Sequence, residues 1–210
     1  MRIILDESPN QPQALLFLAA LFQQEGNDSE ALKLWEQARA NNPDAVEPCI
    51  YLARHYRQER NSTAAQSVAE EAYELAPYSP AAQFEYAISK MSSGNAEDAV
   101  PVIKTMVERF PNSEQAMELL AQAYNLSGDA DALMATLVEL VDRFPDGVKT
   151  RIALARLHLT NENFDAARKL ATELSARHGE QSDGCTLQGD VNFAEGAMPD
   201  ALAAYDKAHE

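Results

Sequence analysis

Residues 12–43 read PQALLFLAALFQQEGNDSEALKLWEQARANNP. The apolar residues Leu15, Leu18 and Phe22 are spaced as on one face of an α-helix, and Gly26 interrupts this pattern. The helical spacing then resumes and runs to a proline, at Ala31, Trp35, Ala38 and Pro43. The stretch therefore predicts two consecutive helices joined by a tight turn.

The same pattern returns every 34 residues along the chain. The prolines that close each unit are Pro9, Pro43, Pro77, Pro111 and Pro145. Small residues recur on the first helix at the same interval, at Ala19, Ala53, Ala87, Ala121, Ala155 and Gly189. A fixed period of this length is typical of stacked helical repeats. The predicted fold class is therefore all-α, a solenoid of antiparallel helix pairs.

The repeated unit resembles the tetratricopeptide repeat, which has apolar, small and aromatic residues on its first helix and Ala, aromatic, Ala and Pro on its second. Those slots hold Leu15, Leu18, Ala19, Phe22, Ala31, Trp35, Ala38 and Pro43. The predicted copies span residues 12–45, 46–79, 80–113, 114–147, 148–181 and a truncated 182–210, with residues 1–11 as the tail of a preceding repeat. The resemblance implies one right-handed superhelical solenoid whose first helices line a concave face.

Within this family, residues 187–208, LQGDVNFAEGAMPDALAAYDKA, are similar in style to bacterial arrays of exopolysaccharide export and PEP-CTERM sorting. That resemblance implies a role in the bacterial envelope and favours the periplasm or envelope over the cytoplasm. Both ends of the chain cut through a repeat, which suggests a fragment of a longer array. The alternative is that Met1 is the native start and that half a repeat serves as the cap.

Three positions depart from the repeat pattern. Arg60 stands where a turn glycine is usual, and we expect the neighbouring Asn61 to adopt the left-handed conformation instead. Pro101 falls inside the expected second helix of the third repeat, so that helix either starts late or kinks. Gly179 replaces a closing proline, and we expect the junction between the fifth and sixth repeats to be the weakest.

The second helix of the fourth repeat has unusually bulky side chains. The residues Leu133, Leu137 and Leu140 fill slots that mostly hold Ala or an aromatic residue elsewhere.

Composition narrows the classes of function. The formal net charge of −16 disfavours a nucleic-acid partner, because binding to phosphates requires a basic surface. No run of 18 apolar residues occurs, so the sequence predicts no membrane span. Cys49 and Cys185 occupy equivalent slots four repeats apart, too distant for a disulfide in a solenoid. The histidines do not form a zinc-protease motif, and no phosphate-binding loop or nucleophile elbow is present. We therefore predict neither an active site nor a cofactor or metal.

The family resemblance implies that ligands touch certain slots of each first helix, on the concave face. In this chain those slots are apolar near the middle of the array and have arginines beside them. The predicted partner-binding residues are Ile50, Arg54, Arg57, Phe84, Ile88, Met91, Gln122, Asn125, Ile152, Arg156 and Leu159. One interpretation is that curvature partly buries these residues against neighbouring helices. The other is a groove for an extended peptide or amphipathic helix with apolar anchors and acidic ends.

The predicted function is a non-catalytic scaffold that binds a protein segment in this groove. Clamping of a chaperone's C-terminal carboxylate is disfavoured, because the slots that the family uses for it hold Leu16 and Ala20. The alternative is the regulatory or substrate-recruiting region of a longer enzyme. Self-association, with one array's open end stacking on another's, is a third possibility.

Overall fold

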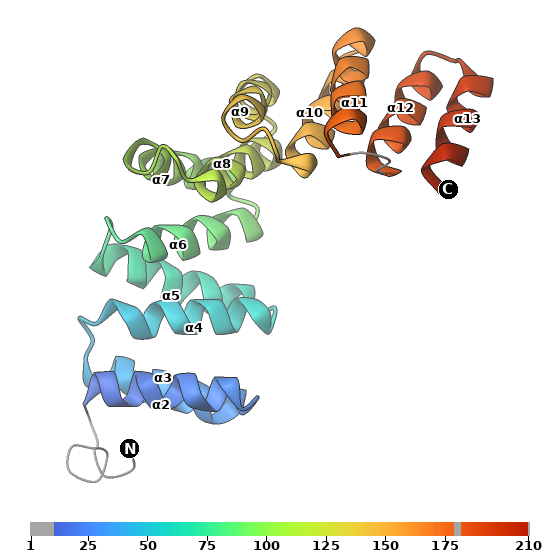
Figure 1. The fold of residues 1–210 in the computed structure, drawn as a ribbon. Coiled ribbons are helices and arrows are strands. Elements are labelled where there is room, and N and C mark those ends of the chain that lie inside the picture. Colours follow the sequence, from blue (N-terminus) through green and yellow to red (C-terminus); the bar gives the residue numbers. More distant parts are fainter. Residues whose placement is uncertain (1–10, 179–181, 210) are drawn as a thin grey trace. The chain divides into compact units, whose positions relative to one another are not determined.

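The computed structural model describes residues 11–178 and 182–209, and the fold within them is all-α (Figure 1). The helices are α2 (Pro12–Gln24), α3 (Asp28–Asn41), α4 (Val46–Gln58), α5 (Ser62–Leu75), α6 (Pro80–Ser92), α7 (Ala96–Arg109), α8 (Glu114–Ser127), α9 (Ala130–Arg143), α10 (Val148–Thr160), α11 (Phe164–His178), α12 (Ser182–Ala194) and α13 (Met198–His209). The first helix of each pair thus begins 34 residues after the previous one. The all-α class predicted from the period is confirmed.

The chain divides into two compact units, Met1–Pro111 and Asn112–Glu210, which we call the N-terminal and C-terminal units. The N-terminal unit contains α2 to α7, and the C-terminal unit contains α8 to α13. The expected tail of a preceding repeat, apart from Gln11, and the expected weak junction at Gly179 lie outside the described residues.

The core of the N-terminal unit is built around Trp35, whose side chain is only 2% exposed. Its indole ring stacks on the ring of Tyr51, with the centroids 5.8 Å apart. Small residues surround it and allow the helices to approach closely, among them Ala19, Ala31, Ala53 and Ala69, all buried. A large ring in one slot is therefore accommodated because the facing slots hold alanine.

Glycine replaces alanine in the small slot of α12 for a similar reason. A Cβ atom at Gly189 would lie 2.4 Å from the ring of Tyr205 on α13, far inside van der Waals contact. The Tyr205 hydroxyl donates a hydrogen bond to Oδ1 of Asp190 at 2.9 Å, which holds the ring over the glycine. The aromatic side chain on one helix thus requires the smallest residue on the other.

The turns between paired helices use a left-handed residue even where glycine is missing. Gly26, Gly94, Gly128 and Gly196 all have positive φ, between 75° and 83°. In the same slot, Arg60 and Glu162 each have φ of 57°.

The expectation that Asn61 would adopt the left-handed conformation is therefore wrong. Asn61 has φ of −86°, and its side-chain oxygen instead accepts a hydrogen bond from the backbone N–H of Ala64 at 3.2 Å. Arg60 takes the left-handed conformation because it occupies the turn slot that holds glycine in four other repeats, and Asn61 caps α5 from outside that region.

Helix α7 passes through Pro101. It begins at Ala96, so the suggested late start of this helix is wrong. Pro101 is the sixth residue of α7, beyond the first turn whose N–H groups have no internal acceptor, so the helix lacks one internal hydrogen bond there. The buried residues Val102, Ile103 and Met106 continue the apolar face after the proline, and their packing holds the helix in place.

Replacing Arg60 with glycine should stabilise the N-terminal unit by about 0.5–1 kcal/mol. The left-handed conformation is unfavourable for a residue with a Cβ atom, whereas glycine adopts it freely at some cost in chain entropy. Chemical denaturation of the parent, Arg60→Gly and Arg60→Ala would measure this effect. Alanine keeps the Cβ atom, so an equal gain from Arg60→Ala would contradict the explanation.

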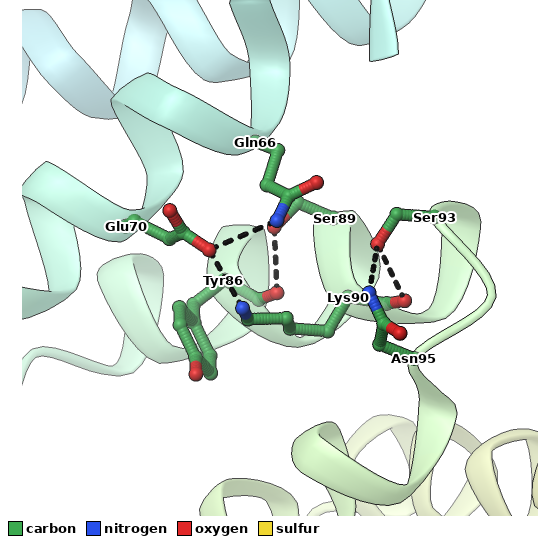
Figure 2. A network of polar contacts seen from close by, with 7 residues as sticks. All are labelled: Gln66, Glu70, Tyr86, Ser89, Lys90, Ser93 and Asn95. Atoms are coloured by element: carbon green, nitrogen blue, oxygen red, sulfur yellow. Dashed lines mark hydrogen bonds and ion pairs between the residues drawn. The ribbon is translucent and has the colours of Figure 1, made fainter. Parts of the chain in front are cut away.

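A polar network joins α5 to α6 within the N-terminal unit (Figure 2). Nζ of Lys90 lies 2.6 Å from Oε1 of Glu70, which also accepts a hydrogen bond from Nε2 of Gln66 at 3.0 Å. These bonds, that of Gln66 first, lower the pKa of Glu70. The Lys90 ammonium also lies 5.3 Å from the centre of the Tyr86 ring, which stacks on Tyr73. The network thus ties the second helix of one repeat to the first helix of the next.

Candidate partner-binding groove

A groove of about 500 Å³ lies within the C-terminal unit, between residues of α8, α9 and α10. Its lining residues are Glu118, Ala121, Gln122 and Asn125 of α8, Leu133, Leu137 and Leu140 of α9, and Lys149, Thr150, Ala153, Arg156, Leu157 and Thr160 of α10. Leu137 and Leu140 are buried, whereas most of the polar lining residues are exposed. The leucines of α9 therefore form the floor, and polar side chains form the rim. We call this site the leucine-floored groove.

One substitution in the repeat pattern accounts for part of this floor. The slot of Leu133 holds alanine in every other repeat, and those alanines are all buried: Ala31, Ala65, Ala99, Ala167 and Ala201. Leu133 is only half-buried, and its side chain lines the groove. The larger side chain cannot occupy the tight space that alanine fills, so it contributes apolar surface to the groove instead.

Helical spacing aligns the polar side chains of the rim. On α10, Lys149, Ala153, Arg156 and Thr160 follow one another at intervals of three and four residues, so they form a single stripe. On α8, the residues Glu118, Gln122 and Asn125 form the facing stripe. Within the described residues, neither Lys149 nor Arg156 has a carboxylate within ion-pair distance in the chain. These two cations are thus available to a bound molecule.

Several residues predicted from the sequence lie in or beside this groove. Gln122, Asn125 and Arg156 are exposed and line it together. Ile152 and Leu159 are half-buried on α10 and are not among its lining residues. The structure therefore brings together the polar members of the predicted set in this unit, whereas the leucine floor of the groove comes from α9.

In the N-terminal unit, the predicted apolar anchors divide by burial. Phe84 and Ile88 are half-buried on α6. Ile50 and Met91 are buried, and Ile50 packs in a core cluster with Cys49. The expectation that Ile50 and Met91 are accessible anchors is corrected, since both side chains pack inside the unit.

The two arginines of α4 are already paired within the protein. Nε of Arg54 lies 3.0 Å from Oε1 of Glu85, and Nε of Arg57 lies 3.4 Å from Oε2 of the same carboxylate. The Glu85 side chain is only 1% exposed, so the arginines provide the charge that this buried carboxylate needs. Arg54 and Arg57, predicted as selectors of an acidic partner, therefore already neutralise a carboxylate within the protein, while their side chains remain more than a third exposed.

The sequence predictions missed the apolar part of the leucine-floored groove. They placed the site on first helices alone, whereas Leu133, Leu137 and Leu140 belong to a second helix. The available signal was the leucine at position 133 in a slot that is alanine in all other repeats.

Cys49 is buried, and its surroundings disfavour the thiolate form. Its thiol lies 3.5 Å from Oε1 of Glu71, and burial together with that negative charge raises its pKa to about 12. Both cysteines are free thiols. Across residues 11–178 and 182–209, no group of three or more His, Cys, Asp or Glu side chains is arranged to hold a metal ion. None of the helices in those ranges has the length and apolarity needed to cross a membrane.

The paired helices and their 34-residue period define a helical-repeat protein. Two family models described as the tetratricopeptide repeat match residues 56–123 and 152–210, together more than half of the chain. The chain belongs to the tetratricopeptide repeat family. A comparison with curated protein sequences returned no match.

Several solved structures are similar in fold. MamA from Desulfovibrio magneticus RS-1 is 17% identical with a TM-score of 0.73, over 81% of this chain and 96% of that one. YrrB, described as a TPR protein with an unusual peptide-binding site, is 14% identical with a TM-score of 0.73, over 94% and 97%. PilW, described as a widely conserved type IV pilus biogenesis factor, is 16% identical with a TM-score of 0.73, over 92% and 90%. These likenesses establish the fold.

Proposed function

We propose that this protein is a non-catalytic interaction scaffold and that the leucine-floored groove is its main binding site for a protein segment. The observation that carries the proposal is an apolar floor beneath a rim of exposed polar side chains, since binding sites combine apolar surface with a few orienting polar groups. Half-buried Phe84 and Ile88 in the N-terminal unit, and Ile152 and Leu159 on α10, are proposed as further contact residues.

The description of YrrB as having a peptide-binding site supports a peptide as the ligand class. A narrower proposal places the scaffold in bacterial envelope assembly, including exopolysaccharide export. Two observations support it. Residues 187–208 resemble the repeats of bacterial exopolysaccharide-export proteins, and a protein of similar fold is described as a pilus biogenesis factor. The alternative proposal is that the array recruits substrates for, or regulates, a longer enzyme.

The proposal is tested by selecting binders from a random peptide library displayed on phage and measuring their affinities. Leu133→Ala should weaken groove-bound peptides by more than about 1 kcal/mol, as expected when a contact central to an interface is truncated. Alanine is the residue that every other repeat has at this slot, so the fold should be preserved.

The matched control is Val138→Ala, on the same helix but 41% exposed and outside the groove lining. Selected peptides should bind this variant as they bind the parent. If the peptides are insensitive to Leu133→Ala but lost with Val138→Ala, a different surface is the binding site. If the library yields no binder at all, the scaffold proposal fails.

A further inference from the structure

The charges on the two walls of the leucine-floored groove differ. Lys149 and Arg156 lie on α10, whereas the facing stripe of α8 has a single charge, that of Glu118. Elsewhere in the described chain, Arg39 and Lys90 each bind a carboxylate of a neighbouring helix, and Arg168 binds Glu195, which directly follows α12. In a protein with a net charge of −16, two exposed cations without such a partner beside an apolar floor favour an acidic ligand.

The distance between these cations restricts the spacing of the acids. Lys149 and Arg156 are seven residues apart on α10, which corresponds to about 10 Å along the helix axis. Three residues of chain in the polyproline II conformation advance about 9 Å and return to the same side. Two carboxylates three residues apart therefore match the two cations.

The size and the lining of the groove favour a short extended segment. Pockets in this volume range hold a drug-sized molecule, which is comparable to a few residues of chain. An extended segment also leaves its backbone N–H and C=O groups without internal partners. The side-chain amides of Gln122 and Asn125 offer both donors and acceptors on the opposite wall.

We propose that the groove binds an extended acidic segment of a partner protein. Two Asp or Glu residues three positions apart pair with Lys149 and Arg156, and a large apolar side chain between them packs on the leucines of α9. This inference rests on the proposed function and specifies the chemistry of the partner at that same site.

The test uses a fluorescently labelled octapeptide with two glutamates three residues apart, a leucine and a proline between them, and serine and glycine at the ends. Matched peptides replace both glutamates with glutamine, both with lysine, or the leucine with alanine. In fluorescence anisotropy titrations, the acidic leucine peptide should bind the full chain, and the glutamine and alanine peptides should bind about tenfold more weakly or worse. Its affinity should fall as the salt concentration rises.

Reversing the charges of the groove should change which peptide the protein prefers, from the acidic peptide to the lysine peptide. The double variant Lys149→Glu with Arg156→Glu should lose the acidic peptide and gain the lysine peptide. The control, Lys33→Glu with Lys169→Glu, changes the net charge equally at exposed side chains outside the groove and should bind like the parent. Equal binding of the acidic peptide to the groove variant and to the control would overturn the inference.

The outcomes separate this inference from the proposed function. If library-selected peptides depend on Leu133 but lack paired acidic residues, the groove is a binding site and the acidic partner is wrong. If neither the selected peptides nor the acidic octapeptide responds to changes in the groove, both proposals fail.

Discussion

Trp35→Ala should destabilise the N-terminal unit by about 3–5 kcal/mol, the range for truncating a large aromatic side chain in a core. The side chain is almost fully buried among alanines, and these cannot move to fill the cavity because their backbones are already in close contact. Removing the indole also removes its stacking contact with Tyr51 and its tilted contact with His55. The measurement is urea denaturation followed by circular dichroism.

Tyr78→Ala provides the control for this variant. Tyr78 is an aromatic residue of the same unit, but it is 72% exposed, and exposed residues rarely contribute more than about 0.5 kcal/mol. A loss from Trp35→Ala no larger than the loss from Tyr78→Ala would show that the core of this unit does not depend on the indole.

Replacing both Arg54 and Arg57 with methionine should cost about 3–5 kcal/mol, because it leaves the Glu85 carboxylate buried without a positive partner. The two arginines are each more than a third exposed, so they lose little when Glu85 is removed instead. Glu85→Leu in the parent should therefore be much less damaging than the double arginine change.

A triple variant with Glu85→Leu, Arg54→Met and Arg57→Met should recover most of the lost stability. Replacing a complete buried ion pair with apolar residues is often neutral, whereas breaking one is not. Arg156→Met is the control, since Arg156 is exposed and has no carboxylate partner among the described residues. If the triple variant is no more stable than the double one, the burial of the unpaired Glu85 carboxylate is not the cause.

This ion-pair arrangement affects the interpretation of binding experiments. Changes at Arg54 or Arg57 would reduce binding through loss of folded protein, whatever surface the partner uses. Lys149 and Arg156 allow the charge of the proposed binding site to be changed without breaking an ion pair within the described chain.

The all-α class and the spacing of the helix pairs were predictable from the sequence, because they depend on local properties. The 3.6-residue periodicity of the apolar residues, the turn glycines and the closing prolines act within a single repeat. The same signals recur in several copies, so an exception such as Arg60 in a glycine slot did not obscure the pattern. The repeat register also indicates which residue of that turn is left-handed, because Arg60 occupies the slot of Gly26, Gly94, Gly128 and Gly196.

The leucine-floored groove was predicted only in part, for a physical reason. Gln122, Asn125 and Arg156 were identified because the period places equivalent slots on one face. Burial and pairing depend on residues from the next repeat, however. Ile50 became core because Ala82, 32 positions later, packs against the same cluster, and Arg54 became an ion-pair partner because Glu85 lies on the following first helix.

The sequence by itself thus determined the helical repeat, its period and the slots that hold small residues, because backbone propensity and side-chain size act locally. Only the tertiary structure decided that the arginines of α4 pair with Glu85 and that the leucine floor of the groove comes from α9. Leu133 differs from its equivalents by one larger side chain, and the space around that side chain is set by three helices together.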